Sequence, residues 1–341
     1  MPTSSEVRVP EISLIIPGWN ENQNILNCIE SLKKQTYQNF KLFIILGGPD
    51  KEIIEKAKNI EWPQLIVLDQ TVPNKMKAYN TAIKHPDLGD ILVFSDMDCE
   101  FPDHFLNLYI DAFTDKKKNI VTGRVCPDRQ GKTFIDRYHR NFEAKVAPKT
   151  AKTVKSIGGA NFAVRKNFLL NRFGLFDETV VIGTDKAISN RMNNIGETIY
   201  FEPGIVVYSK YFSAGLVKYL KQQSRWIRIN VLGQRNSDNK GFRRSLIALL
   251  LPWLMCLIFP IGIAVLKPVF HGRFLWGWYF FIFAWIAIFV LSWLKRYKIL
   301  RYTKGTVMED VIAATCMLLI HYSIHMAAGL QLFIKKYRFR W

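Results

Sequence analysis

The first hundred residues alternate between short apolar runs and stretches with helical spacing. The apolar runs lie at 12–17, 41–46, 65–68 and 91–94. The stretches between them lie at 22–35, 51–58 and 76–84. In the first of these stretches, Ile25, Ile29 and Leu32 recur on one helical face. Strands that alternate with helices predict an α/β fold with a parallel, doubly wound sheet, which binds ligands at the carboxyl ends of its strands.

The chain becomes much more apolar from Leu246 onward. Three long apolar segments lie at 246–266, 274–294 and 311–334. Each is long enough to cross the hydrocarbon core of a bilayer as a helix. Pro252 and Pro260 would allow the first segment to be kinked or re-entrant. We therefore predict a domain with interfacial helices over 1–235 and a membrane domain of about three helices over 246–334.

A basic, partly amphipathic stretch lies between Gly123 and Lys155. Its apolar side chains that share one helical side are Phe134, Ile135, Tyr138 and Phe142. The pattern predicts a helix that either lies on the membrane surface or packs on the sheet.

The formal net charge is +19, from 47 Lys and Arg against 28 Asp and Glu. Much of the excess lies beside the apolar segments, which favours an anionic membrane surface and a phosphorylated substrate over a nucleic acid. The first ten residues lack the apolar stretch of a secretory signal. We therefore expect the N-terminal domain on the cytoplasmic side. The five cysteines form no C-x-x-C, which fits reduced, structural thiols in that domain and in its membrane helices.

Two carboxylates follow the apolar run at 91–94. Asp96 and Asp98 lie one residue apart, close to the end of the predicted strand. Hard oxygen ligands of this kind suit Mg²⁺ or Mn²⁺, which bind through one or two carboxylates plus the phosphates of a substrate. The alternative is that Asp98 caps a helix that begins near Pro102 and that Asp96 is a turn residue. A D-x-D pattern alone does not decide between the two.

A third carboxylate, Asp185, precedes an amphipathic pattern that includes Ile188 and Arg191-Met192. The pattern predicts a helix with Asp185 in its first turn. A carboxylate there is stabilised by the helix dipole. The functional alternative is a general base that takes a proton from an acceptor hydroxyl. By itself, the pattern favours the structural role at the start of the helix.

Gln222, Arg225 and Trp226 precede the apolar segments at helical spacing, so they project from one face. An arginine there can neutralise a diphosphate through paired hydrogen bonds, and a tryptophan can stack on a sugar ring. The alternative is an interfacial aromatic residue beside a snorkelling arginine, which is common near membrane entry points.

Seven pieces of the chain, in order, resemble motifs of the family 2 glycosyltransferases. The pieces are Ile15–Glu21, Ser31–Tyr37, Lys75 with Ala78 and Asn80, Asp96 with Asp98, Gly158–Phe162 with Arg165, Asp185, and Gln222 with Arg225 and Trp226. The resemblance covers nearly all of 11–235. It implies a GT-A (Rossmann-like) nucleotide-sugar-binding domain, followed here by the predicted transmembrane helices.

The resemblance also implies a role for each matching residue. Asp185 would be the catalytic base, and Asp98 with Asp96 would hold Mg²⁺ or Mn²⁺. The residues expected to bind the nucleotide sugar are Pro17, Asn20, Glu21, Asp50, Lys75, Asp96 and Arg225. The residues expected to bind the acceptor are Gly159, Ala160, Asn161, Gln222 and Trp226. The helix around Lys75, Ala78 and Asn80 is the one that touches the donor's phosphates in the family.

The sequence departs from the family pattern at two places. Where the family has D-D-G-S after its second strand, this chain has Leu46-Gly47-Gly48-Pro49-Asp50, so only Asp50 remains to contact the nucleoside. Where the family has E-D before the catalytic helix, this chain has Thr184-Asp185. The expected base is kept and its acidic neighbour is lost.

These features together predict a metal-dependent, inverting hexosyltransferase. The expected donor is a nucleotide-diphosphate sugar such as a UDP-sugar, and the expected acceptor is a lipid-linked oligosaccharide or a polysaccharide at the bilayer, in exopolysaccharide or capsule assembly. The alternatives are a processive synthase of the hyaluronan, chitin or cellulose kind and a glycolipid-forming enzyme. From other classes, a sugar-nucleotide pyrophosphorylase and a non-catalytic membrane scaffold remain possible.

Overall fold

The structure is a computed structural model of the 341-residue chain. It describes residues 10–19, 24–181, 183–210, 216–237, 275–303 and 306–334. Internal contacts divide the chain into two compact units. The first unit comprises 1–131 and 146–211, and the second comprises 132–145 and 212–341. The contacts thus group the helix over 216–237, which we assigned to the first domain, with the second unit.

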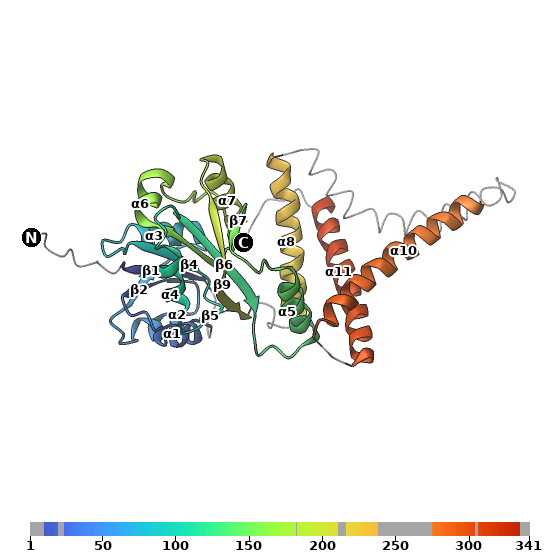
Figure 1. Ribbon diagram of the computed structural model, residues 1–341, viewed down its shortest axis with the longest axis horizontal. Coiled ribbons are helices and arrows are strands. Elements are labelled where there is room, and N and C mark those ends of the chain that lie inside the picture. Colours follow the sequence, from blue (N-terminus) through green and yellow to red (C-terminus); the bar gives the residue numbers. More distant parts are fainter. Residues whose placement is uncertain are drawn as a thin grey trace, which may run out of the picture. The chain divides into compact units, whose positions relative to one another are not determined.

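The first unit contains a sheet of nine strands (Figure 1). The strands are β1 (Ile12–Trp19), β2 (Phe40–Gly47), β3 (Leu65–Asp69), β4 (Ile91–Ser95), β5 (Cys99–Glu100), β6 (Ile120–Pro127), β7 (Lys152–Val154), β8 (Asn161–Arg165) and β9 (Ile199–Ser209). The four predicted strands of the first hundred residues are confirmed as β1 to β4.

The sheet is mixed, with the order β3-β2-β1-β4-β8-β6-β9-β5 and β7 paired with β9. The predicted parallel arrangement holds for β3, β2, β1 and β4. It fails at β8, which runs antiparallel to both β4 and β6, and at the short strands β5 and β7, whereas β6 and β9 are again parallel. The reversal places the start of β8 beside the end of β4, because Ser95 is opposite Asn161.

The helices of the first unit cover both faces of the sheet. They are α1 (Asn24–Lys33), α2 (Lys51–Lys58), α3 (Lys75–Ile83), α4 (Phe105–Ala112), α6 (Lys166–Phe168) with the π-helix η1 (Leu169–Phe173), and α7 (Thr184–Asn194). Strand residues alternate between two buried clusters, as the two-residue period of a strand requires. Ile12, Leu14 and Ile16 of β1 pack with α1, α2 and α4, whereas Ile15 packs with α3, η1 and α7. The predicted α/β fold with helices on both faces is therefore confirmed.

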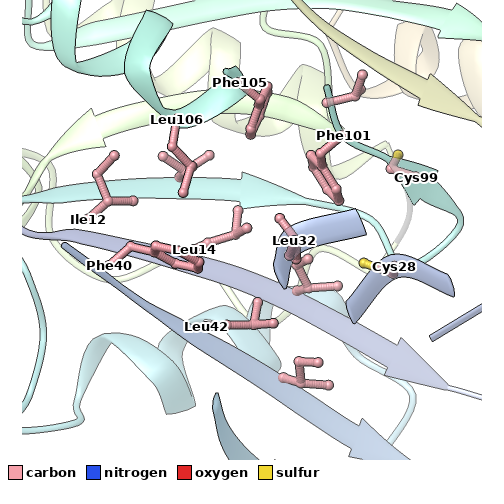
Figure 2. Packing of buried hydrophobic residues seen from close by; sticks show 14 of the residues in the cluster. Ile12, Leu14, Cys28, Leu32, Phe40, Leu42, Cys99, Phe101, Phe105 and Leu106 are labelled. Atoms are coloured by element: carbon pink, nitrogen blue, oxygen red, sulfur yellow. The ribbon is translucent and has the colours of Figure 1, made fainter. Parts of the chain in front are cut away.

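Figure 2 shows part of the first cluster, in which side chains of β1 and β2 meet those of α1 and α4. Leu14, Leu32 and Phe105 are fully buried there. Burying side chains of this size stabilises the fold by about 1.5–3 kcal/mol each. This packing fixes the helices against the sheet and so fixes the ends of the strands on which the site is built.

The second unit is helical in its described part. It contains α5 (Phe134–Val146), α8 (Leu216–Ser237), α10 (Leu275–Leu300) and α11 (Val307–Ile334). Its core joins α5 to the other helices through Ile135, Tyr138, Tyr219, Leu300 and Met317. The amphipathic stretch that we expected on the membrane surface or on the sheet forms α5, and its apolar face packs on these helices.

The membrane prediction is supported at one helix. Among the described residues, only Val307–His325, within α11, has both the length and the hydropathy of a membrane span. The segment 274–294 lies mostly in α10. The segment 246–266 lies outside the described residues. A membrane domain of several helices stays a prediction.

Candidate active site

The acidic pair lies at the carboxyl end of β4, beside the start of β8. Ser95 ends β4, and its hydroxyl donates a hydrogen bond of 2.7 Å to the Ala160 carbonyl. Asp96 and Asp98 follow directly and lead into β5. Strand β1 ends close by, since Met97 packs so tightly on Gly18 that a Cβ there would lie 1.6 Å from its Cε. A larger residue at position 18 would force the end of the Met97 side chain to move.

Lys75 joins the acidic pair to the chain before β8. It is the first residue of α3, and its ammonium forms an ion pair with Asp96 and donates to the Gly159 carbonyl at 3.2 Å. Burial alone would lower the pKa of the Lys75 ammonium, but the negative charge of Asp96 raises it above its usual range. Lys75 is therefore a fixed positive charge at this edge of the sheet.

Asp98 lies in a different electrostatic setting. Burial, together with the negative charge of Asp96, raises its pKa to about 6. The Ser209 hydroxyl donates to its Oδ2 at 3.1 Å, and the Cys99 thiol lies 3.7 Å from its Oδ1. The alternative role as a helix cap is wrong, because the cap residue of α4 is His104. Nothing in the sequence pointed to Ser209, which lies 111 residues away from Asp98.

Asp185 is in the first turn of α7, as predicted. Gly183 precedes the helix with φ of 67°, a left-handed conformation that favours glycine. The Asp185 side chain is exposed and lies against Gly159, where a Cβ would sit 3.1 Å from the Asp185 Cβ and 3.9 Å from its Oδ2. Gly159 thus has Lys75 at its carbonyl and Asp185 at its Cα.

Helix α7 is docked on the same segment by a second contact. The Ser189 hydroxyl donates to the Asp185 carbonyl at 2.6 Å and accepts from the Ile157 N–H at 3.0 Å. The structure therefore brings together four predicted site residues: Lys75, Asp96, Gly159 and Asp185.

Other predicted residues are used within the fold. Asp50 caps α2, where its Oδ1 accepts from the Ile53 N–H at 3.3 Å. Pro17 is partly buried near the end of β1. Asn20 and Glu21 lie outside the described residues.

The chain around the start of β8 is held by internal hydrogen bonds. The Ala160 carbonyl accepts from Ser95, and Asn161 is fully buried. The Asn161 side chain accepts from the Tyr109 hydroxyl at 2.6 Å and donates to the carbonyls of Arg124 and Ile205. Its amide is thus used to hold β6, β8, β9 and α4 together, and a contact between Asn161 and an acceptor stays a prediction.

Gln222, Arg225 and Trp226 lie on α8 of the second unit. Arg225 and Trp226 are exposed, and Gln222 is partly buried. Their predicted contacts with a diphosphate and a sugar stay predictions.

The carboxylates fit a divalent cation that arrives with a phosphorylated ligand. Among the described residues, no group of three or more His, Cys, Asp or Glu side chains could hold a metal ion. Asp96 and Asp98 lie close enough for the charge of one to raise the pKa of the other, and a cation would remove that repulsion. Two carboxylates completed by substrate phosphates are the usual arrangement for Mg²⁺.

Carboxylates and a lysine thus lie at the carboxyl ends of strands in an α/β sheet, which is where such sheets bind ligands. The chain matches the family model described as Glycosyl transferase family 2 over residues 13–191, more than half of its length. It belongs to that family.

Relatives and one solved structure agree with this assignment. The chain is 25% identical over 206 residues to glycosyltransferase AglE of Haloferax volcanii, covering 58% of this chain and 66% of that protein. It is 23% identical over 232 residues to a Methanococcus voltae protein named dolichyl N-acetyl-alpha-D-glucosaminyl phosphate 3-beta-D-2,3-diacetamido-2,3-dideoxy-beta-D-glucuronosyltransferase, covering 62% of this chain and 70% of that protein.

The mannosyltransferase PcManGT of Pyrobaculum calidifontis, solved with GDP-Man and Mn²⁺, has a similar fold. The TM-score is 0.58 at 17% sequence identity, over 97% of this chain and 89% of that one. This similarity confirms the mixed α/β, GT-A-like architecture.

Proposed function

We propose that this chain is an inverting glycosyltransferase that moves a sugar from a nucleoside-diphosphate donor to a lipid-linked oligosaccharide presented at a membrane. One observation carries the proposal. Gly159 separates a donor side, made by the Lys75–Asp96 ion pair, from an exposed carboxylate, Asp185, that faces it from α7. A transferase of this kind needs a cation beside the leaving group and a base beside the acceptor.

The donor side is suited to a diphosphate. Lys75 is held beside Asp96 by an ion pair and lies at the carboxyl end of the sheet, so its charge can stabilise the departing phosphates. Asp98, supported by Asp96, would hold Mg²⁺ or Mn²⁺. When bound, the ion offsets negative charge on the leaving diphosphate.

Asp185 acts as the general base. It takes the proton from an acceptor hydroxyl, whose oxygen forms a bond to the anomeric carbon of the donor sugar. The bond between that carbon and the phosphate oxygen breaks, and the nucleoside diphosphate leaves with the electron pair. Because attack and departure occur on opposite faces, the anomeric configuration inverts. The exposure of Asp185 leaves its carboxylate accessible to an acceptor.

Two observations support an acceptor at the membrane. The Methanococcus relative is named for a dolichyl phosphate-linked sugar. Helix α11 contains Val307–His325, which has the length and hydropathy of a membrane span. We therefore propose that Gln222, Arg225 and Trp226 of α8 contact the bound substrates, as their likeness to the Q-x-x-R-W motif suggests.

Incubation of the full chain in detergent with a panel of nucleotide sugars, Mn²⁺ or Mg²⁺, and polyprenyl-phosphate-linked acceptors tests the proposal. We expect metal-dependent transfer, detected by mass spectrometry of the lipid product. Asp185→Asn should lower kcat by about 10²–10⁴-fold, because a general base contributes that much. Its affinity for the donor nucleotide should change little.

Asp111→Asn is the matched control, since Asp111 is an exposed carboxylate on α4 and should leave transfer unchanged. Loss of donor binding in Asp185→Asn would contradict the role of base. A wild-type chain without turnover and without metal-dependent nucleotide binding would favour the non-catalytic scaffold.

A further inference from the structure

Residues Phe173–Glu178, which we call the bridging segment, connect the two halves of the candidate active site. The segment precedes α7, which contains Asp185. It is also hydrogen-bonded to α3, which begins with Lys75. The segment therefore contacts both the helix that carries Lys75 and the helix that carries Asp185.

Asn80 of α3 makes most of the contact with the bridging segment. It is 2% exposed, and its amide nitrogen donates to the Phe176 carbonyl and to Glu178 Oε1, both at 2.9 Å. Its amide oxygen accepts from the Phe176 N–H, also at 2.9 Å. Both donor hydrogens and the acceptor of the side chain are therefore used by the fold. This is a different use from the phosphate contact that the sequence resemblance implies for this helix.

Two further contacts hold the segment on α3. Asn74 caps the helix by accepting from the Lys77 N–H at 3.0 Å, and its amide nitrogen donates to the Glu178 carbonyl at 2.7 Å. The rings of Tyr79 and Phe176 pack with their centroids 5.5 Å apart. The end of α3 that carries Lys75 is thus the end that holds Glu178.

The other side of the bridging segment is bound by α7. The Arg191 guanidinium donates to the Leu175 carbonyl at 2.6 Å and also to the Phe173 carbonyl. It lies 4.3 Å from the centroid of the Phe173 ring. The segment is consequently tied to α3 at one end and to α7 at the other.

We propose that Asn80 is a positioning residue for the transfer reaction, which sets the separation between Lys75 on the donor side and Asp185 on the acceptor side. The inference rests on the proposed function of these two residues. Asn80 touches neither substrate and acts through the bridging segment. Correct placement of reacting groups matters because a displacement of about 1 Å can lower a rate by about 10²-fold.

A pair of substitutions tests the contact between Asn80 and Glu178. Asn80→Asp keeps the acceptor for the Phe176 N–H, removes the donor to the Phe176 carbonyl and places a second carboxylate beside Glu178. We expect kcat to fall about 10- to 100-fold, while the dissociation constant of the donor nucleotide changes less than about twofold, because no donor contact is lost. Glu178→Gln alone should be close to wild type, since its amide oxygen still accepts.

The double variant Asn80→Asp, Glu178→Gln should recover part of the lost kcat, because the glutamine amide can donate to the new carboxylate, although the Phe176 carbonyl still lacks its donor. Relief of the repulsion restores stability as well as kcat, so a separate control for stability is needed. Ser13→Ala is the control for stability, since the buried Ser13 hydroxyl accepts from the Gly89 N–H at 2.8 Å. It should lower the unfolding midpoint and leave kcat unchanged.

Hydrogen exchange of the amides of 184–189 supplies a readout that does not require turnover. We expect faster exchange in Asn80→Asp, recovery in the double variant, and no change in Ser13→Ala. Unchanged exchange and kcat in Asn80→Asp, or donor affinity that falls together with kcat, would overturn the positioning role. A wild-type chain that transfers no sugar would count against the proposed function alone, because the exchange pattern still decides the contact.

Discussion

Two carboxylates, one in each unit, differ in how far neighbouring positive side chains offset their charge. Asp310 of the second unit is fully buried and lies 2.8 Å from the Arg137 guanidinium and 3.4 Å from that of Arg301. Asp98 of the first unit is close to a second carboxylate, Asp96, and its side-chain hydrogen bonds come from a neutral hydroxyl and a thiol. Burial and the negative charge of Asp96 raise the pKa of Asp98 to about 6, and these two hydrogen bonds offset only part of that rise.

The difference separates a structural carboxylate from one that is available to a ligand. Arg137 comes from α5, Arg301 follows α10 and Asp310 belongs to α11, so this cluster joins parts of the chain that are far apart in sequence. In the part of the chain that the structure describes, Asp98 has no ion-pair partner, and the charge of Lys75 offsets only part of the effect of burial and of Asp96 on its pKa. A cation bound with a diphosphate would supply further positive charge there.

The strongest test of this comparison is Asp98→Asn. We expect transfer to fall by at least about 10²-fold, as when other groups that stabilise transition-state charge are removed. The unfolding midpoint should stay the same or rise, because an unneutralised carboxylate is replaced by a neutral side chain of similar shape. Transfer assays with Mn²⁺ and thermal unfolding measure the two effects. A large loss of stability would show instead that Asp98 is a structural carboxylate, like Asp310.

Asp310→Asn should act mainly on stability, in contrast to Asp98→Asn, which should act mainly on transfer. Removing one partner of a buried ion pair leaves uncompensated charge and costs about 3–5 kcal/mol. We expect a clear fall in the unfolding midpoint of the full chain in detergent. Glu309→Gln, on the same turn of α11, is the control, because Glu309 is exposed and its acceptor for the Thr306 N–H is retained. Equal midpoints for the two variants would show that the Asp310 cluster is not structural.

The sequence predicted the elements of the first unit well because their signals are local. Runs such as Ile91–Phe94 and the spacing of Ile25, Ile29 and Leu32 depend only on neighbours along the chain. The D-x-D pair and Asp185 could also be found, since both lie beside the ends of such elements.

Contacts between distant residues could not be predicted in the same way. Neither the antiparallel β8 beside β4 nor the bond between Ser209 and Asp98 leaves a pattern in the sequence. Asn80 illustrates the limit most clearly, because its motif pointed to a phosphate and its hydrogen bonds go to Phe176 and Glu178. A motif identifies a position, whereas the folded chain determines what the side chain there contacts.

A smaller effect is expected on the pH dependence of the stability of the second unit. Burial lowers the pKa of His139 to about 4, and its Nε2 lies 2.8 Å from the Tyr219 hydroxyl. In the unfolded chain this histidine has the ordinary value of 6.5, so the unfolded state binds more protons between pH 4 and 6.5. The free energy of unfolding should therefore decrease as the pH is lowered from 6.5 to 4, by at most about 1.4 kcal/mol per pH unit.

Unfolding midpoints at pH 7.5 and 5 measure this slope, and His139→Gln should flatten it while keeping a partner for Tyr219. The groups near His139 are Asp136 on its own helix, Tyr219 on α8 and His321 on α11. Because they remain in the variant, part of the slope should remain. A slope that is identical in wild type and variant would exclude His139 as its source.

The smallest expected effect on stability and activity is that of substituting Asp50. It tests whether Asp50 is a structural carboxylate, like Asp310, or contacts the ligand, as proposed for Asp98. Its carboxylate caps α2, so the fold already uses it, although it is the only aspartate left where the family motif holds the nucleoside. Asp50→Ala should cost about 1 kcal/mol of stability, and Asp50→Ser only a few tenths, because serine also caps helices well. If capping is its role, donor KM should be unchanged in Asp50→Ser. A rise in KM for that variant, with stability retained, would instead place Asp50 with Asp98 as a carboxylate that contacts the ligand.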